Sequence, residues 1–260
     1  MNEKEVLPDV KNIKQQETYT LPSKGLVYNR EDNIPSAITL RRMTTKEDKI
    51  RLRNQSEDRI RKELLQACIL EPDVDAGKLK LVDANFLLFR LRTLSLLDDT
   101  YKIGIRCNHC GTEFVHQINL SDIDVKYIKD EDLNLLNVNL PMCQAEIKLK
   151  FPSIDDIISL SDKLTEYFDR FPTADRGEAL YTSGMAVYID SVNGNQLMFE
   201  EMESYLDNMD IIDNRELSVA ISKLDNLYGF DNDLYTKCPK CKQEVKHGLP
   251  ITSELFTPSK

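Results

Sequence analysis

The 260-residue sequence contains no tryptophan, only three histidines and only nine glycines. The histidines are His109, His116 and His247, and all three lie near cysteines, so none is left elsewhere to act as a general base. The chain also has no glycine-rich phosphate loop, no Gly-x-Ser-x-Gly elbow and no His-Glu-x-x-His motif. These absences predict a protein that is not an enzyme and has no small-molecule substrate.

Long apolar runs are missing as well. Residues 1–17 contain no apolar stretch behind basic residues, so they do not resemble a signal peptide. The most apolar segment, residues 84–97, is interrupted by Arg90 and Arg92 and is shorter than the roughly 20 residues that span a bilayer. We therefore expect a soluble protein without a membrane partner, made in a reducing cytoplasm. In that compartment six cysteines indicate metal ligands or buried thiols before disulfides.

Charge is unevenly distributed along the chain. The formal net charge is −10, which argues against nonspecific nucleic-acid binding. Residues 41–62 nevertheless contain nine Lys or Arg and four Asp or Glu, a net charge of +5, so the remainder carries −15. This segment is either a solvated helix face or a basic surface that docks on an acidic neighbour, such as another copy of the chain.

The pattern of strand and helix signals predicts an α+β fold in which helices surround a small β-ribbon that carries two cysteine hairpins. Five regions are expected: a flexible N-terminal arm, a β-hairpin with helices, a first cysteine hairpin with a further β segment, an acidic helical insertion, and a second cysteine hairpin with a tail. Their bounds are 1–18, 19–100, 101–150, 151–232 and 233–260.

Local signals mark several helix starts. Thr44 and Glu47 have the spacing of a capping box. Asp83 is interpreted as the N-cap of the leucine-rich helix, whose two arginines either extend to the surface or meet carboxylates. Cys68 lies on an apolar stripe and is interpreted as a core residue, and Ser153 is expected to cap a helix of the acidic block.

Two Cys-x-x-Cys pairs, Cys107 with Cys110 and Cys238 with Cys241, enclose the 127 residues from 111 to 237. Each pair follows a basic residue, and a Glu and a His come three and six residues after its second cysteine. Zn²⁺ takes four thiolates in a tetrahedron, and a two-residue gap lets one tight turn direct two of them at one ion. The sequence therefore favours one zinc per chain, held by all four cysteines. A filled shell of four thiolates makes that zinc structural.

Other interpretations of the cysteines stay open. They are disulfides, a thioredoxin-type redox motif, and separate metal sites completed by His109, His116 or His247. The long separation does not exclude a shared site. Closing such a loop costs about 4 kcal/mol, whereas a structural zinc contributes ~10–16 kcal/mol.

Four short segments follow one another in the chain: "LPSKGLVY", "ITLRRMTTKEDKI", "DANFLLFRLRTLSLLDDTYKIGIRCNHCG" and "LYGFDNDLYTKCPKCKQEV". Their order resembles that of the baseplate hub or hub-assembly proteins of T-even-like contractile-tailed bacteriophages. The resemblance covers residues 20–256 and departs at Arg42, where the family pattern has proline.

The resemblance implies a structural protein of the virion, located in the hub region of the tail baseplate. Its partners would be other baseplate and tail proteins and copies of itself. Two alternatives from other classes are an assembly chaperone that is absent from the finished particle and a zinc-ribbon adaptor that binds nucleic acid. Purified tails would lack the chaperone, and the adaptor would shift DNA or RNA in a salt-dependent manner.

Overall fold

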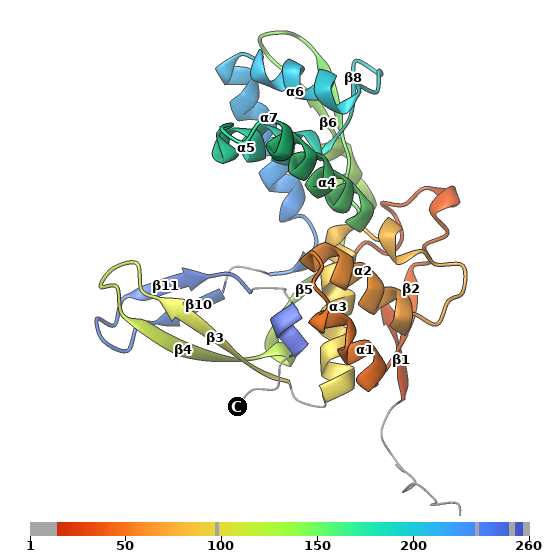
Figure 1. Cartoon of the computed structure of the whole chain (residues 1–260), viewed down its shortest axis with the longest axis vertical. Helices are drawn as coiled ribbons and strands as arrows, with labels where there is room; N and C mark the ends of the chain where they lie inside the picture. Colours follow the sequence, from red (N-terminus) through yellow and green to blue (C-terminus); the bar gives the residue numbers. More distant parts are fainter. Residues whose placement is uncertain (1–14, 97–98, 232–233, 250–252, 257–260) are drawn as a thin grey trace, which may run out of the picture.

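The computed structural model describes residues 15–96, 99–231, 234–249 and 253–256, which form helices and small antiparallel sheets (Figure 1). This mixture confirms the α+β class. The helices are α1 Thr45–Asp48, α2 Glu57–Cys68, α3 Leu81–Leu96, α4 Ile154–Arg170, α5 Arg176–Ala186, α6 Phe199–Asp207 and α7 Ile211–Asp225. The strands are β1 Gln16–Thr20, β2 Ala37–Arg41, β3 Thr100–Arg106, β4 Glu113–Asn119, β5 Val125–Lys126, β6 Asn137–Asn139, β7 Glu146–Leu149, β8 Ile189–Val192, β9 Gly229–Phe230, β10 Leu234–Lys237 and β11 Glu244–His247.

One hydrophobic core, here called the proximal core, is built around α3. It joins α2, the antiparallel pair β1–β2 and the inner faces of both cysteine hairpins. Leu87 and Leu91 of α3 are fully buried in it, and so is Cys68, as its position on the apolar stripe of α2 predicts. The capping box at Thr44 is confirmed, because the Glu47 carboxylate accepts the Thr44 N–H at 2.8 Å. The arm expected over 1–18 lies outside the described residues up to position 14, and β1 begins at Gln16.

The prediction that Asp83 is the N-cap of α3 is wrong. The helix begins two residues earlier, at Leu81, and Asp83 lies fully buried in its first turn. Its carboxylate accepts hydrogen bonds from the Ser23 N–H at 3.1 Å and from the Tyr28 hydroxyl at 2.7 Å. Burial raises the pKa of Asp83 to about 6. Asp83 therefore anchors the loop that follows β1 onto α3.

The two arginines of α3 lie against aromatic rings. Arg92 does not extend to the surface: its side chain is fully buried, and its guanidinium donates to the Thr100 carbonyl at 2.9 Å and stacks on the Tyr101 ring. Arg90 lies over the Phe86 ring, 5.0 Å from its centroid. Both arginines thus pack their planar groups against aromatic rings, where cation–π attraction replaces part of the lost hydration.

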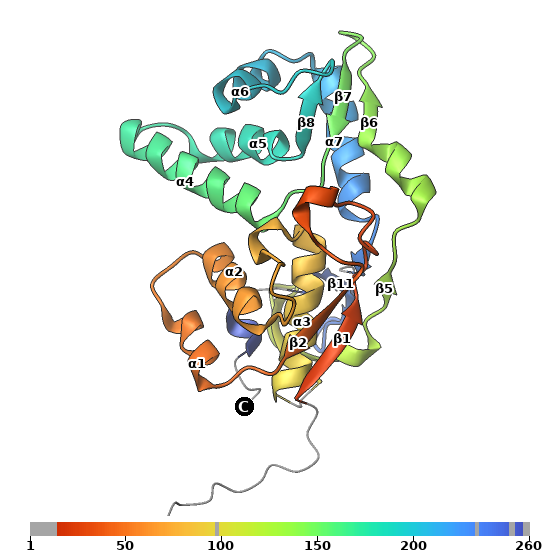
Figure 2. The same cartoon turned by 90° about the vertical axis from the view of Figure 1, so that its right-hand side faces the viewer.

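A second hydrophobic core, here called the distal core, is built from the three-stranded sheet β6–β7–β8 and the helices α5, α6 and α7. Ile147 of β7 and Leu217 and Leu224 of α7 are fully buried in it. The Asp213 carboxylate, also buried, accepts the N–H groups of Met142 and Cys143 and so fixes the β6–β7 turn to α7. Figure 2 shows these elements gathered at one end of the long axis, with α1 near the other end.

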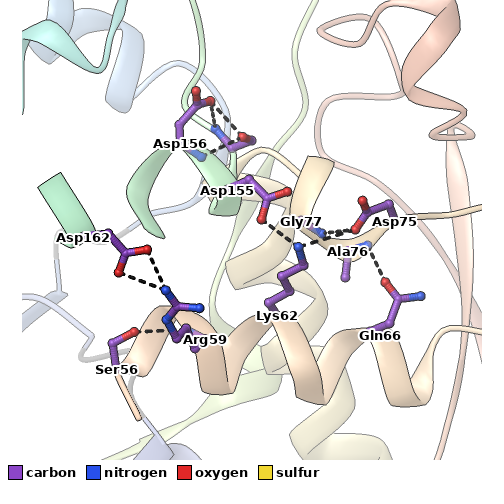
Figure 3. Close-up of polar contacts among 11 residues, drawn as sticks. Ser56, Arg59, Lys62, Gln66, Asp75, Ala76, Gly77, Asp155, Asp156 and Asp162 are labelled. Carbon is purple, nitrogen blue, oxygen red and sulfur yellow. Dashed lines mark hydrogen bonds and ion pairs between the residues drawn. The ribbon is translucent and has the colours of Figure 1, made fainter. Parts of the chain in front are cut away.

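Helix α4 packs on the proximal core and also contacts α6, because Lys163 lies over the Phe199 ring. Ser153 caps its first turn, as predicted, and Ile154 is buried in the proximal core. Its acidic side chains reach back to α2: Arg59 donates two hydrogen bonds to Asp162, at 2.6 and 2.9 Å, and Lys62 lies 2.8 Å from Asp155 (Figure 3). Part of the basic segment 41–62 therefore meets acidic partners within its own chain.

Among the described residues, no helix is long and apolar enough to cross a membrane.

Candidate metal centre

Two β-hairpins carry the cysteine pairs and share the same strand pairing. β3 is antiparallel to β4, and β10 is antiparallel to β11. Arg106 pairs with Glu113 in the first hairpin, and Lys237 pairs with Glu244 at the corresponding place in the second. The basic residue before each cysteine pair thus faces the glutamate after it, as expected for two similar β-turn-β units. Figure 1 shows both hairpins projecting together from the rest of the chain.

The turns that hold the cysteines are also alike. The Cys107 N–H donates to the Thr112 carbonyl at 2.9 Å, and the N–H of Gly111 donates back to the Cys107 carbonyl at 2.9 Å. In the second turn the Cys238 N–H donates to the Gln243 carbonyl at 2.9 Å, and the Lys242 N–H donates to the Cys238 carbonyl at 3.0 Å. The fourth residue after the first cysteine has a left-handed backbone in both turns, with φ of 71° at Gly111 and 64° at Lys242.

These turns bring all four predicted cysteines together. Cys107 Sγ lies 3.7 Å from Cys241 Sγ, and Cys110 Sγ lies 3.7 Å from Cys238 Sγ. The four sulfur atoms lie within 4.8 Å of one another. A tetrahedral ion with metal–sulfur bonds of about 2.3 Å requires sulfur–sulfur distances of about 3.8 Å. The cluster therefore has the donor set and the dimensions to hold one metal ion.

The electrostatics of the cluster also fit a cation. Hydrogen bonds between Cys110 and Thr112, whose Oγ1 lies 3.3 Å from Cys110 Sγ, lower the pKa of the Cys110 thiol to about 6. The Gln243 N–H lowers the pKa of Cys241, but the neighbouring cysteine thiols outweigh it and raise that pKa to about 12. Several thiolates this close together repel one another, so the protein alone favours a partly protonated cluster. A divalent ion would allow all four to ionise.

The histidines near the cysteines have another role. His116 Nδ1 lies 3.1 Å from the Thr236 hydroxyl, and the His116 and His247 rings pack edge to face with centroids 5.3 Å apart. These contacts join the two hairpins behind the cysteine turns. His109 is exposed in its turn. Among the described residues, the group that could hold a metal contains the four cysteines and no histidine, so separate histidine-completed sites are not supported.

The structure also bears on the redox and disulfide interpretations. All six cysteines are free thiols, and 3.7 Å is far longer than a disulfide bond of about 2.05 Å. Both pairs lie in turns between strands, whereas a thioredoxin-type motif begins at a helix N-terminus. Cys143 is exposed near Tyr205, away from the cluster. The sequence identified each of these cysteines but gave no signal for the supporting contacts of Thr112 and Thr236.

Comparison with known proteins identifies a family. The family model described as "T4 bacteriophage base plate protein" matches residues 18–257, which include both hairpins, both cores and α4. No curated protein and no solved structure matches the chain. Because the family model spans nearly the whole sequence, the chain belongs to the T4 bacteriophage base plate protein family.

Proposed function

We propose that the chain is a structural component of the hub region of a contractile-tail baseplate and that it performs no catalysis. The family match over residues 18–257 is the observation that carries this proposal. Family membership supports a location in the virion and contacts with other baseplate proteins. We further propose contacts between copies of the chain and no role in nucleic-acid binding, in line with the net charge of −10.

The proposed metal is one structural Zn²⁺ held by Cys107, Cys110, Cys238 and Cys241 in a zinc-ribbon arrangement. Four sulfur ligands at tetrahedral spacing are the donor set of structural zinc sites. Four thiolates leave no open position for a substrate or an activated water, which supports a structural role. The ion would join the ends of the 127-residue segment between the hairpins and so hold the distal core to the proximal one.

The test of the hub assignment is the composition of purified particles. We expect mass spectrometry of intact tails, and of baseplates separated from them, to find the chain in a fixed ratio to the other baseplate proteins. Its presence in assembly intermediates but not in finished tails would instead favour the assembly chaperone. A salt-dependent shift of DNA or RNA by the purified protein would favour the nucleic-acid adaptor.

A further inference from the structure

Most cations of the basic segment 41–62 are already used within the chain. Its ion pairs are Arg41–Glu47, Arg51–Asp48, Arg53–Glu63, Arg59–Asp162, Arg61–Asp58 and Lys62–Asp155. Lys46 and Lys49 are exposed, and neither has an ion-pair partner among the residues that the structure describes. Three of these pairs use carboxylates outside the segment, Glu63, Asp162 and Asp155, which reduces the +5 surplus to +2. Arg42 is half-buried and donates to the Ser95 carbonyl, so the exposed, unpaired positive charge in the described part of the segment lies at Lys46 and Lys49.

An exposed apolar side chain accompanies these two lysines. Leu52, on the 3₁₀ turn Ile50–Leu52 that follows α1, is 72% exposed. Lys46, Lys49 and Leu52 are spaced three residues apart along successive helical turns, and side chains at this spacing are neighbours on a helix surface. We call these three residues the α1 knob. Its chemistry is one apolar tip beside two uncompensated positive charges.

The opposite end of the molecule carries a surface of complementary chemistry. Leu180 and Tyr181 of α5 are 55% and 57% exposed, and Ile211 and Ile212 of α7 are 77% and 50% exposed. The two helices touch, because the Tyr181 hydroxyl donates to Asn214 at 2.7 Å. We call these four apolar residues the α5–α7 face. Single exposed apolar residues are ordinary on a protein surface, but four on two contacting helices are typical of an interaction site.

The surroundings of the α5–α7 face are acidic. Residues 175–184 and 207–219 contain five exposed Asp or Glu and two exposed Arg. Glu178 lies one turn before Tyr181, and Glu216 lies one turn after Ile212. Both are exposed and have no ion-pair partner in the described part of the chain. The face therefore suits a partner with an apolar tip and flanking positive charges.

We propose that the α1 knob of one copy docks on the α5–α7 face of a second copy. This inference rests on the proposed structural function and specifies one of its contacts. Figures 1 and 2 place α1 near one end of the long axis and α5 with α7 at the other, so a single chain cannot bring its own knob and face together. The contact is head-to-tail, which builds a ring when the rotation between copies closes and a filament when it does not.

The cysteine hairpins are the other basic surface, and they are a weaker match for this face. Arg106, Lys237, Lys240 and Lys242 are exposed there, around the four sulfurs. A zinc ion with four thiolates carries a net charge of −2, which these cations offset locally. The carboxylates nearest to Lys46 and Lys49 in the sequence, Glu47 and Asp48, are paired with Arg41 and Arg51, so attraction to a neighbouring copy remains available to the two lysines.

The experiment uses two charge-reversal variants of the full chain. The knob variant is Lys46→Glu with Lys49→Glu, and the face variant is Glu178→Lys with Glu216→Lys. Sedimentation velocity over a series of protein concentrations measures the size of the assemblies at low and high salt. The matched controls reverse two charges each elsewhere on the surface: Lys78→Glu with Lys223→Glu for the knob, and Glu31→Lys with Glu200→Lys for the face.

We expect the wild-type protein and both controls to form oligomers at low salt that dissociate as the salt concentration rises. Each variant alone should be monomeric. An equimolar mixture of the knob and face variants should assemble again, because each intact knob meets an intact face and each reversed knob meets a reversed face. A chain carrying all four substitutions should assemble again through reversed charges.

Several results would overturn the docking mode. They are wild-type protein that stays monomeric at its highest soluble concentration in low salt, a mixture that stays monomeric, or controls that dissociate as the variants do. These results are separate from the test of the hub function. A chain found in purified baseplates but monomeric in this experiment would retain its proposed function and lose this contact.

Discussion

Loss of one cysteine of the cluster should both release the metal and destabilise the fold. Replacing Cys107 or Cys238 by serine removes one of four ligands, one from each hairpin. A cross-link that closes a loop of about 130 residues stabilises a fold by about 4–5 kcal/mol through the unfolded chain alone. Whole domains are stable by only ~5–15 kcal/mol. We therefore expect each substitution to release the zinc and to leave the proximal core close to unfolding.

The structure predicts where the effect spreads. Tyr101, Ile103 and Ile105 of β3 and Val245 of β11 belong to the proximal core, so loosening the hairpins exposes the side of α3. The distal core contains no residue of either hairpin. Amide hydrogen exchange should thus quicken in β3, β4, β10, β11 and α3 and change less in α7.

The assay measures zinc by elemental analysis and stability by guanidinium unfolding. Wild type should hold one zinc per chain and both serine variants none. Two other cysteines provide matched controls. Cys143→Ser changes an exposed thiol and should alter neither quantity, whereas Cys68→Ser changes a buried thiol and should reduce stability while keeping the zinc. If each ligand variant still held one zinc, or if metal-free wild type unfolded at the same guanidinium concentration as the loaded protein, the shared site would be refuted.

Three further predictions concern the junction of the cores and α3. A double-mutant cycle with Arg59→Ala and Asp162→Ala should give a coupling of about 0.2–1 kcal/mol that fades in roughly 1 M salt, because both side chains are solvent-exposed; a coupling unchanged by salt would contradict this. Gly77→Ala places a Cβ 2.3 Å from an Asp155 oxygen and should cost about 1 kcal/mol by displacing that carboxylate from α2, a penalty that Asp155→Ala should remove. The pKa of Asp83 is about 6 in the folded chain and near 3.8 in the unfolded chain. The stabilisation that protonated Asp83 contributes is therefore complete below pH 3.8 and is lost, by up to ~3 kcal/mol, as the pH rises through about 6. The free energy of unfolding, measured with a chemical denaturant across this pH range, should fall with pH in wild type and not in Asp83→Asn.

The cysteine hairpins could be predicted from the sequence because their signals are local. A basic residue, two cysteines two residues apart and a following glutamate recur in the same order, and strand register turns that order into the same pairing twice. The residue with the left-handed backbone in each turn is harder to recognise from the sequence. Gly111 has the backbone that glycine tolerates, but the equivalent position is Lys242, which has a φ of 64° and hides the repeat from a glycine-based search.

Helix α3 shows why its start could not be predicted. An aspartate directly before an apolar run is the usual sign of an N-cap, yet α3 begins at Leu81, whose N–H is satisfied by the Pro152 carbonyl at 2.9 Å. That partner lies about seventy residues away. Asp83 is then free to bind Ser23 and Tyr28, which lie 60 and 55 residues before it. Tertiary contacts replace the local cap here, and no sequence window contains both partners.

The ion-pair partners that the charged segment 41–62 has on α4 could not be predicted from the sequence either, because they lie far away along the chain. The sequence counts charges but not their partners, and the structure pairs Arg59 with a carboxylate 103 residues away and Lys62 with one 93 residues away. The cysteine cluster joins residues still farther apart, 134 positions in the case of Cys107 and Cys241. The ion pair of Arg59 with Asp162 is exposed and weakened by salt, whereas metal–thiolate bonds are not. Rising salt should therefore loosen the contact of α4 with α2 while the hairpins stay joined, and chelation should do the reverse.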